Sequence, residues 1–212
     1  MSEFTEGTLF RRSDTPIIEN TVKRLTIPQR LETLNDEWGV LLADVRLNSA
    51  NRTELGGWAR ESSSSLPLLG FQHAGDHGWG YQLFHEGKIC ASCEVSHEIE
   101  FGMVVEQIEA LHPDLDPMDV YVSNEALTQR LYAEICQSAA YRANIEAQYQ
   151  HKNVAAFASF GTPPNVIRRL DALLTAESYL KAPLEQVFQF REALNLLPME
   201  WKNYHYDDKE GE

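Results

Sequence analysis

Long apolar runs are absent from this sequence of 212 residues. The longest, such as Val40 to Ala43, cover only a few positions, whereas a helix that crosses a bilayer needs roughly 20. Residues 1–7 are polar and lack the basic and then apolar pattern of a signal peptide. We therefore expect a cytoplasmic protein that does not cross a membrane.

Cysteine is also scarce, and occurs only as Cys90, Cys93 and Cys136. An odd, small number of cysteines without an export pattern argues against a disulfide framework. Cys90 and Cys93 form a C-x-x-C pattern, but they lie on an alternating segment typical of a strand. A strand would hold them about 10 Å apart on opposite faces, beyond disulfide reach. No second C-x-x-C completes a zinc site, so we expect reduced, independent thiols.

Basic residues are too few to balance the acidic ones. The chain has 18 lysine and arginine residues against 32 aspartate and glutamate residues, a formal net charge of −14. Residues 61–125 contribute −11, because Lys88 is their one basic residue against 12 acidic ones. Such a segment repels phosphate backbones and anionic lipid, and attracts a cation or a basic protein. Lysine and arginine cluster only in pairs, so we expect no nucleic-acid binding. A simpler interpretation is that the acidic charge serves solubility.

The common enzyme signatures are missing as well. The sequence contains no G-x-S-x-G, no Walker-type phosphate loop, no G-x-G-x-x-G and no H-E-x-x-H. These absences remove the motifs that would identify a hydrolase, a nucleotide-binding protein or a zinc protease. No reaction is therefore indicated by a motif, and the functional argument depends on charge and on the placement of single residues.

The sequence does contain enough apolar material for a core, since 43% of its residues are hydrophobic. In the first third, Pro28 is suited to open a helix with Leu31, Leu34 and Trp38 on one face. The glycine- and serine-rich composition of residues 48–65 predicts a loop. Strands are predicted at Thr8 to Arg11, Val40 to Leu47, Leu66 to Phe71 and Trp79 to Phe84.

The strongest pattern is a strict alternation from Ile89 to Phe101, typical of a strand with one buried face. With the preceding strand it predicts a hairpin at 79–101. A three-residue loop, His85 to Gly87, would pair Leu83 with Ile89 and place the apolar residues of both strands on one face. That loop requires a positive φ at Gly87. His97 falls among the apolar positions, so we expect a hydrogen-bonded core histidine there.

From Glu125 onward the spacing becomes helical, and further helices are predicted near Pro164 and Pro183. Inward-facing positions predict burial of Leu131, Ile145, Leu170 and Phe188. Weak alternation over Met199 to Tyr206 would allow a final strand, and we expect the acidic end, residues 207–212, to be frayed.

Strands first and helices afterwards predict an α+β fold. The expected architecture is an antiparallel β-sheet in the N-terminal half, packed against a C-terminal group of α-helices. Residues 1–124 would form a mixed α/β sheet domain. Residues 125–212 would form a helical region packing on that sheet, or a small second subdomain.

Glu94, Glu98 and Glu100 alternate on the outward face of the predicted strand, and we take them as candidate partner-binding residues. Together with the charge of the middle segment, they favour a non-enzymatic acidic interaction protein, immunity- or adaptor-like. Such a protein would bind a basic protein partner and need no cofactor. Like charges on one strand face are equally typical of a protected sheet edge.

The alternative is a metal-dependent enzyme. His73, Asp76 and His77 supply residue types that bind divalent transition metals, in a loop that contains Gly75 and Gly78. One of the three glutamates could add a ligand from the neighbouring strand. The H-x-x-D-H pattern has no fixed meaning, however, and a polar glycine-containing turn explains it equally well.

Overall fold

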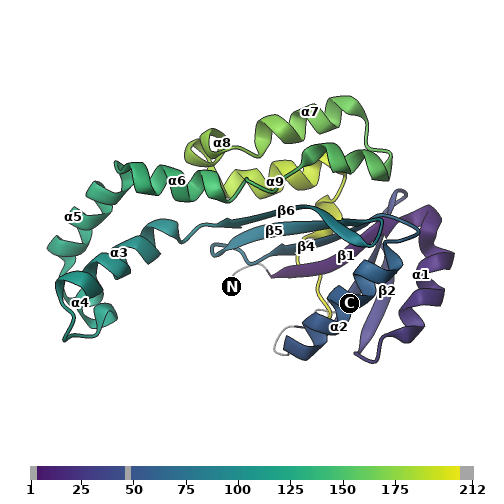
Figure 1. The fold of residues 1–212 in the computed structure, drawn as a ribbon, viewed down its shortest axis with the longest axis horizontal. Coiled ribbons are helices and arrows are strands. Elements are labelled where there is room, and N and C mark those ends of the chain that lie inside the picture. Colours follow the sequence, from purple (N-terminus) through teal and green to yellow (C-terminus); the bar gives the residue numbers. More distant parts are fainter. Residues whose placement is uncertain (1–3, 46–48, 206–212) are drawn as a thin grey trace, which may run out of the picture.

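The structure is a computed structural model that describes residues 4–45 and 49–205. The expectations for the polar start of the chain at 1–3 and for a frayed end at 207–212 lie outside the described residues. The described part is an α+β fold built on a six-stranded antiparallel sheet of strand order β2-β3-β1-β4-β5-β6 (Figure 1). The strands are β1 (Thr5–Arg11), β2 (Gln29–Thr33), β3 (Trp38–Ala43), β4 (Leu68–His73), β5 (Gly78–His85) and β6 (Lys88–Ser96).

Helices lie on both faces of this sheet and also extend beyond it. The α-helices are α1 (Thr15–Thr21), α2 (Ser49–Ser62), α3 (Ile99–Leu111), α4 (Pro117–Ser123), α5 (Glu125–Cys136), α6 (Ala139–Ala147), α7 (Pro164–Leu173), α8 (Ala176–Lys181) and α9 (Pro183–Ala193). Short 3-10 turns cover Arg12–Asp14, Val22–Arg24, Val154–Phe160 and Leu197–Met199. Among the described residues, no helix has both the length and the apolar character needed to cross a bilayer.

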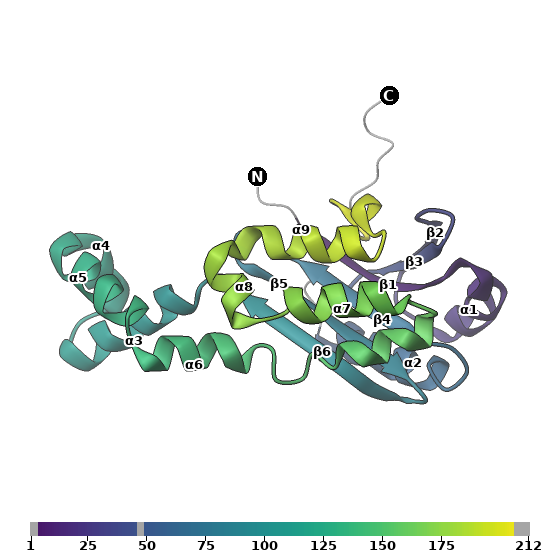
Figure 2. The same cartoon turned by 90° about the horizontal axis from the view of Figure 1, so that it is seen from above.

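One face of the sheet is covered by α7, α8, α9 and the Val154–Phe160 turn (Figure 2). Phe190 of α9 is fully buried there and its ring lies 5.0 Å from Trp79 and 5.2 Å from Tyr81, centroid to centroid. The Tyr81 hydroxyl donates to the Lys152 carbonyl at 2.6 Å. The ring contacts of Phe190 and the hydrogen bond of the Tyr81 hydroxyl hold this layer on the sheet.

The opposite face is only partly covered. Helices α1 and α2 pack over the β2-β3-β1 side, where Ile18 and Trp58 join a second core with Leu41 and Phe84. Over β4, β5 and β6 the same face presents exposed polar side chains, including Gln72 and Gln82. The sheet therefore has one closed face and one face that is half open.

The hairpin between β5 and β6 forms, but its loop is shorter than predicted. His85 pairs with Lys88, so the turn holds two residues, Glu86 and Gly87, both at positive φ. A β-bulge then shifts the register, and Leu83 pairs with Ala91 instead of Ile89. Because the bulge inserts one extra residue, the apolar residues of β5 and those of β6 from Ala91 onward still lie on one face, as predicted. Ile89, before the bulge, is 38% exposed.

Strand β6 also ends earlier than its alternation predicted, at Ser96. Ile99 to Phe101 belong to α3, in which Val104 and Ile108 are buried one turn apart. The prediction of a strand to residue 101 is wrong because helical spacing continues from these same residues and buries a longer apolar face. In the tail, residues 199–205 contain no strand, and Leu197–Met199 form a 3-10 turn.

Two predictions for the first third are wrong. The helix predicted from Pro28 is the β2-β3 hairpin, whose turn is held by the Asn35 side chain accepting from the backbone of Glu37 and Trp38 at 2.9 Å. This local turn chemistry prevails over the helical spacing. The loop predicted at residues 48–65 is largely helix α2 despite Gly56 and Gly57, because burying Trp58 against the sheet outweighs their weak helix propensity.

The helical half follows the sequence more closely. Leu131, Ile145 and Leu170 are buried, as predicted. Phe188 is 50% exposed, which contradicts its predicted burial. Helix α9 turns Val187 and Phe190 towards the sheet, so Phe188 lies on its outer side.

Candidate functional site

The open half of the sheet face carries two rows of polar residues, set by the strand register. The first row runs Glu6, Gln72, Gly80, Glu94 across β1, β4, β5 and β6, and the second runs Thr8, Gly70, Gln82, Ser92. Each row contains one glycine on a central strand, so each has a gap between polar side chains. The face is therefore a polar platform that lacks a side chain at two positions.

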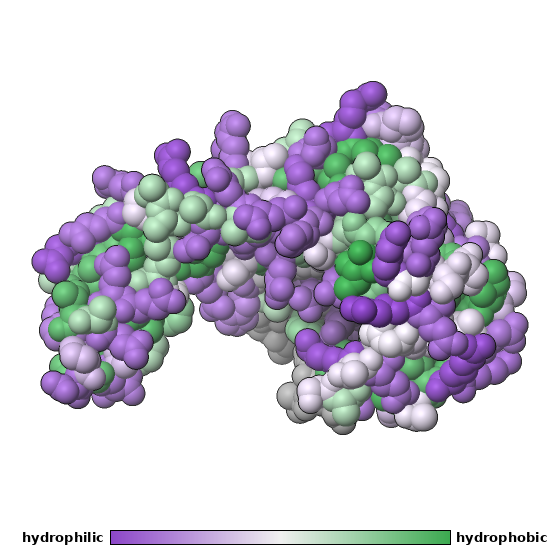
Figure 3. Space-filling view, in the orientation of Figure 1, coloured by the Kyte–Doolittle hydropathy of each residue, from purple (hydrophilic) through white to green (hydrophobic). Residues whose placement is uncertain are grey.

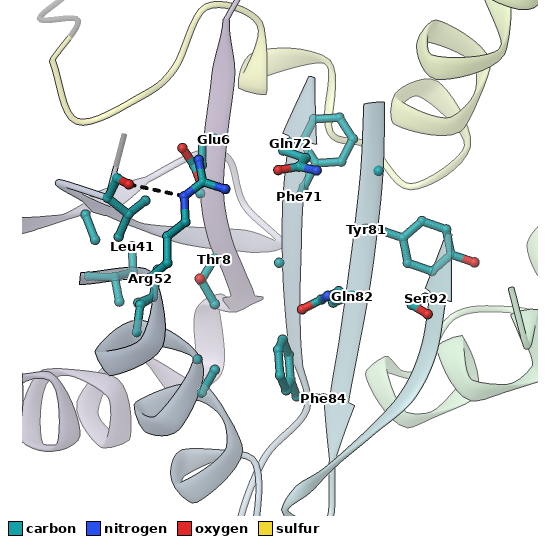
Figure 4. A pocket seen from close by; sticks show the side chains of 18 of the residues that line it. Glu6, Thr8, Leu41, Arg52, Phe71, Gln72, Tyr81, Gln82, Phe84 and Ser92 are labelled. Atoms are coloured by element: carbon teal, nitrogen blue, oxygen red, sulfur yellow. Dashed lines mark hydrogen bonds between the residues drawn. The ribbon is translucent and has the colours of Figure 1, made fainter. Parts of the chain in front are cut away.

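Two adjoining hollows lie over this platform. The larger, of about 470 Å³, is bounded by α2 and by β1, β4, β5 and β6 (Figure 4). The smaller, of about 310 Å³, lies towards the β4-β5 turn at His77 and the end of β6 at Ser96. Arg52, Gln72 and Glu94 line both hollows, so the two meet at these residues.

Arg52 is the one lysine or arginine among the described residues that lines either hollow. Its Nε donates to the Val45 carbonyl at 3.2 Å, which holds the guanidinium beside the open sheet face (Figure 4). Within the described part of the chain, no acidic side chain forms an ion pair with it. Its Nη groups are therefore available to an anionic group in the hollow.

The three glutamates predicted to share one strand face are not together on one face. Glu94 lies on β6 and is exposed at the open sheet face. Glu98 follows β6, and its Oε1 lies 2.9 Å from His77 Nδ1. Glu100 lies in the first turn of α3 and accepts from the Tyr141 hydroxyl. Because the strand ends at Ser96, only Glu94 keeps the predicted position.

The three candidate metal residues, His73, Asp76 and His77, differ in their surroundings. His73 is buried within β4, whereas Asp76 and His77 are exposed in the turn that follows. His77 Nε2 lies 3.9 Å from Asp76 Oδ1. Among the described residues, no group of three or more histidine, cysteine, aspartate or glutamate side chains is placed to hold a metal ion.

Two histidines, His77 in the β4-β5 turn and His97 between β6 and α3, have opposite electrostatic environments. The hydrogen bond and charge of Glu98 raise the pKa of His77 above its ordinary value. Burial, and then the charge of His73, lower the pKa of His97. The His97 ring stacks on Tyr179 with centroids 6.0 Å apart, and no hydrogen bond to either of its ring nitrogens is found in the described part of the chain. His97 was predicted to be a hydrogen-bonded core histidine, and the prediction of hydrogen bonds to its ring is therefore wrong.

The cysteines are free, in agreement with the prediction of separate thiols. Cys93 is buried on the covered sheet face, and desolvation raises the pKa of its thiol to about 12. A thiol with so high a pKa is a poor nucleophile at neutral pH. Cys90 is partly buried, and its thiol lies 3.4 Å from the His85 carbonyl.

A second candidate surface is the arm, which we define as residues 99–136 (α3, α4 and α5). The arm packs on itself through buried residues such as Ile108, Val120 and Leu131, and extends past the edge of the sheet (Figures 1 and 2). The molecule is hollowed between the arm and α2 (Figure 3). The arm carries eight acidic residues and one basic residue, Arg130.

The end of the arm exposes apolar side chains. We call the following four the tip residues: Leu111 (54% exposed), Leu115 (57%), Met118 (43%) and Val122 (76%). Exposed acidic residues lie among them in the chain, namely Glu109, Asp114, Asp116 and Asp119. An apolar patch with a rim of one charge is typical of a protein-binding surface.

Comparison with protein-family models, with curated proteins and with solved structures finds no match to this chain. The candidate surfaces therefore depend on their own geometry. Sequence reasoning missed Arg52, which lies in the segment predicted as a loop, and the tip residues. One pattern could have indicated the open platform. Glycine and glutamine occur two positions apart on each of two neighbouring strands, as Gly70 and Gln72 and as Gly80 and Gln82.

Proposed function

We propose that this protein is a non-enzymatic, immunity- or adaptor-like interaction protein that binds a basic protein partner. The binding surface would consist of the arm and of the sheet face beside it, including Glu94. The observation that carries the proposal is the composition of the arm. It combines eight acidic residues with four exposed apolar tip residues on helices that extend away from the sheet.

Charge supports a basic partner. No lysine or arginine occurs between residues 89 and 129, a span with nine acidic residues. A field of one sign raises the rate at which an oppositely charged protein associates, and salt screens this effect over about 8 Å at physiological ionic strength. The acidic residues would therefore guide the partner to the arm, and the tip residues would supply apolar area for a stable contact.

The shape of the molecule supports a protein rather than a small ligand at the arm. The hollow between the arm and α2 is open on one side (Figure 3). Standard protein interfaces bury about 800 Å² on each partner, so a partner needs a surface of this extent. The acidic arm and the polar open sheet face, which includes Glu94, would together provide the contact area.

The proposal is tested by charge variants compared at equal net charge. Wild-type protein is first used as bait to isolate a partner from an extract of its source cells, and the purified pair is then studied kinetically. The arm variant is Glu106→Gln/Glu109→Gln/Asp119→Asn. The control variant, which removes three exposed charges outside the arm, is Glu19→Gln/Glu146→Gln/Glu185→Gln.

We expect the arm variant to associate about tenfold more slowly than wild type at low salt, and the control to change far less. The difference between the variants should shrink as salt is added. A partner with an acidic isoelectric point, or equal association rates for the two triple variants, would overturn the proposal.

A further inference from the structure

The groove on the open sheet face is lined by one cation and two carboxylates, with Arg52 and Glu6 on the β1 side and Glu94 on the β6 side. Arg52 reaches it from α2, next to β1 (Figure 4). Glu94 lies on β6 and lines it as well. Gln72 and Gly80 lie between Glu6 and Glu94 in the first polar row. Since Arg52, Gln72 and Glu94 are the residues at which both hollows meet, a ligand there would face a cation, an amide and an anion.

The charged groups are available for a ligand. In the described part of the chain, the Arg52 guanidinium bonds only the Val45 carbonyl, through Nε, and the Glu94 carboxylate has no hydrogen bond or ion pair. The side-chain amides of Gln72 and Gln82 are exposed and likewise make no hydrogen bond to the described residues. Each amide offers two donors and one acceptor oxygen, which complements a peptide group.

The two glycines in the floor have different reasons to be glycine. A Cβ on Gly80 would lie 2.7 Å from the Cys93 carbonyl oxygen, so the fold itself excludes a side chain there. A Cβ on Gly70 would make only ordinary contacts, at 3.7 Å from the Gln82 carbonyl oxygen and the Phe84 ring. The strand pairing therefore does not require glycine at residue 70, and its missing side chain leaves the groove open beside Phe84.

The width of the groove limits the ligand. Strands β1 and β6 are separated by three inter-strand spacings, roughly 14 Å. An extended arginine places its carboxylate and its guanidinium about 7 Å apart, on ordinary bond lengths of about 1.5 Å. One charged hydrogen bond at each end adds about 3 Å, so an arginine or a lysine spans most of this distance.

We infer that the groove binds the carboxyl-terminal basic residue of a peptide chain. Its terminal carboxylate accepts from the Arg52 guanidinium, its side-chain cation donates to Glu94, and the preceding peptide group bonds the Gln72 or Gln82 amide. In a free amino acid, an ammonium group lies beside the carboxylate, and the Arg52 guanidinium would repel it. In a peptide, a neutral amide takes the place of this ammonium group. The inference rests on the proposed function, because it takes this residue to be that of the basic partner.

The test uses small probes and needs no partner. Nα-acetylarginine has both charges, Nα-acetylargininamide lacks the carboxylate, Nα-acetylcitrulline lacks the side-chain cation, and free arginine adds an ammonium group. Each is titrated into the full-length protein while the backbone and glutamine side-chain amides are followed by NMR. The variants are Arg52→Gln and Glu94→Gln, with Arg60→Gln on the same helix and Glu106→Gln on the arm as controls, since neither residue lines the groove.

Wild type and both controls should bind acetylarginine about fivefold more tightly than acetylargininamide or acetylcitrulline, each of which lacks one of its two charges, the size expected for one exposed ion pair. Arg52→Gln should bind acetylarginine and its amide equally, and Glu94→Gln should bind acetylarginine and acetylcitrulline equally. Gly70→Ala should weaken the binding of acetylarginine without lowering the urea midpoint of unfolding. If free arginine bound more tightly than acetylarginine, the inference that the ligand belongs to a peptide chain would be overturned.

Equal binding of the three acetylated probes to wild type, or no change at the Gln72 and Gln82 amides, would overturn the inference altogether. Failure here is distinguishable from failure of the proposed function. If the probes fail but a basic partner still depends on the arm charges, only the groove assignment is lost. If the probes bind as expected but no basic partner exists, the proposed function is lost and the groove remains a site for a carboxyl-terminal basic residue.

Discussion

His77 Nδ1 lies 2.9 Å from Glu98 Oε1, at the point where the arm leaves the sheet. The bond joins the β4-β5 turn to the residue that precedes α3. Both side chains are exposed, so the pair is screened by solvent. Its consequence is a shift of the His77 pKa above the ordinary value, caused first by the hydrogen bond to Glu98.

The first prediction concerns this pKa. A raised pKa of a folded histidine contributes stability that is present below pH 6.5 and is lost as the pH rises through the folded value. We expect an NMR titration of the imidazole protons to place His77 above 6.5 in wild type, and Glu98→Gln to return it towards 6.5. An unchanged His77 titration in Glu98→Gln would show that the two side chains do not interact in solution.

His97 should have the opposite effect on stability. Burial and the charge of His73 lower its pKa, so below pH 6.5 the unfolded chain takes up a proton that the folded chain resists. Stability is therefore lost as the pH falls from 6.5 towards the folded pKa. His97→Phe keeps a ring against Tyr179 and should lose less stability between pH 7 and pH 5 in urea unfolding. A parallel loss in wild type and variant would contradict this assignment.

Two phenylalanines two residues apart in α9 provide a matched test of the core. Phe190 is fully buried among Phe71, Trp79, Tyr81 and Phe157. Phe190→Ala should therefore cost about 3–5 kcal/mol in the free energy of unfolding. Phe188→Ala, at a half-exposed position, should cost under about 1 kcal/mol. Similar costs at both positions would mean that α9 packs on a different face.

The two-residue turn between β5 and β6 makes a further prediction. Glu86 has φ 54° and Gly87 has φ 76°, so both residues occupy the left-handed region. Asparagine tolerates this region better than glutamate, and alanine tolerates it worse than glycine. Glu86→Asn should raise the free energy of unfolding by a few tenths of a kcal/mol, and Gly87→Ala should lower it by about 1 kcal/mol. Stabilisation by Gly87→Ala would rule out this turn.

The sequence predicted the structure best where packing constrains each position of a pattern. The alternation on β5 and β6 predicted the buried face of Tyr81 and Cys93 because packing constrains every second residue. It did not predict the bulge near Cys90, since the same face results from a two-residue turn with a bulge and from a three-residue loop. Packing also decided α2, where the burial of Trp58 prevails over the local preference of Gly56 and Gly57.

The candidate site was less predictable than the fold. The groove needs Arg52 from α2 and Glu94 from β6, which are 42 positions apart in the sequence and meet only through the sheet order. Glu94, Glu98 and Glu100 were grouped by their spacing, and the change from strand to helix after Ser96 separates them. The acidic character of the middle segment was visible from composition, but the exposure of Leu115 and Val122 was not.

The measurement that tests the proposed function most directly is the affinity of the purified partner for a variant with a polar arm tip. The tip variant is Leu115→Ser/Val122→Ser. The control is Leu180→Ser/Leu184→Ser, which removes two leucines that are 45% and 61% exposed and lie outside the arm. Calorimetry should show the tip variant binding at least about tenfold more weakly, as expected when central apolar contacts are lost, and the control within about twofold of wild type. Equal affinities of wild type and tip variant would contradict the arm as the binding surface.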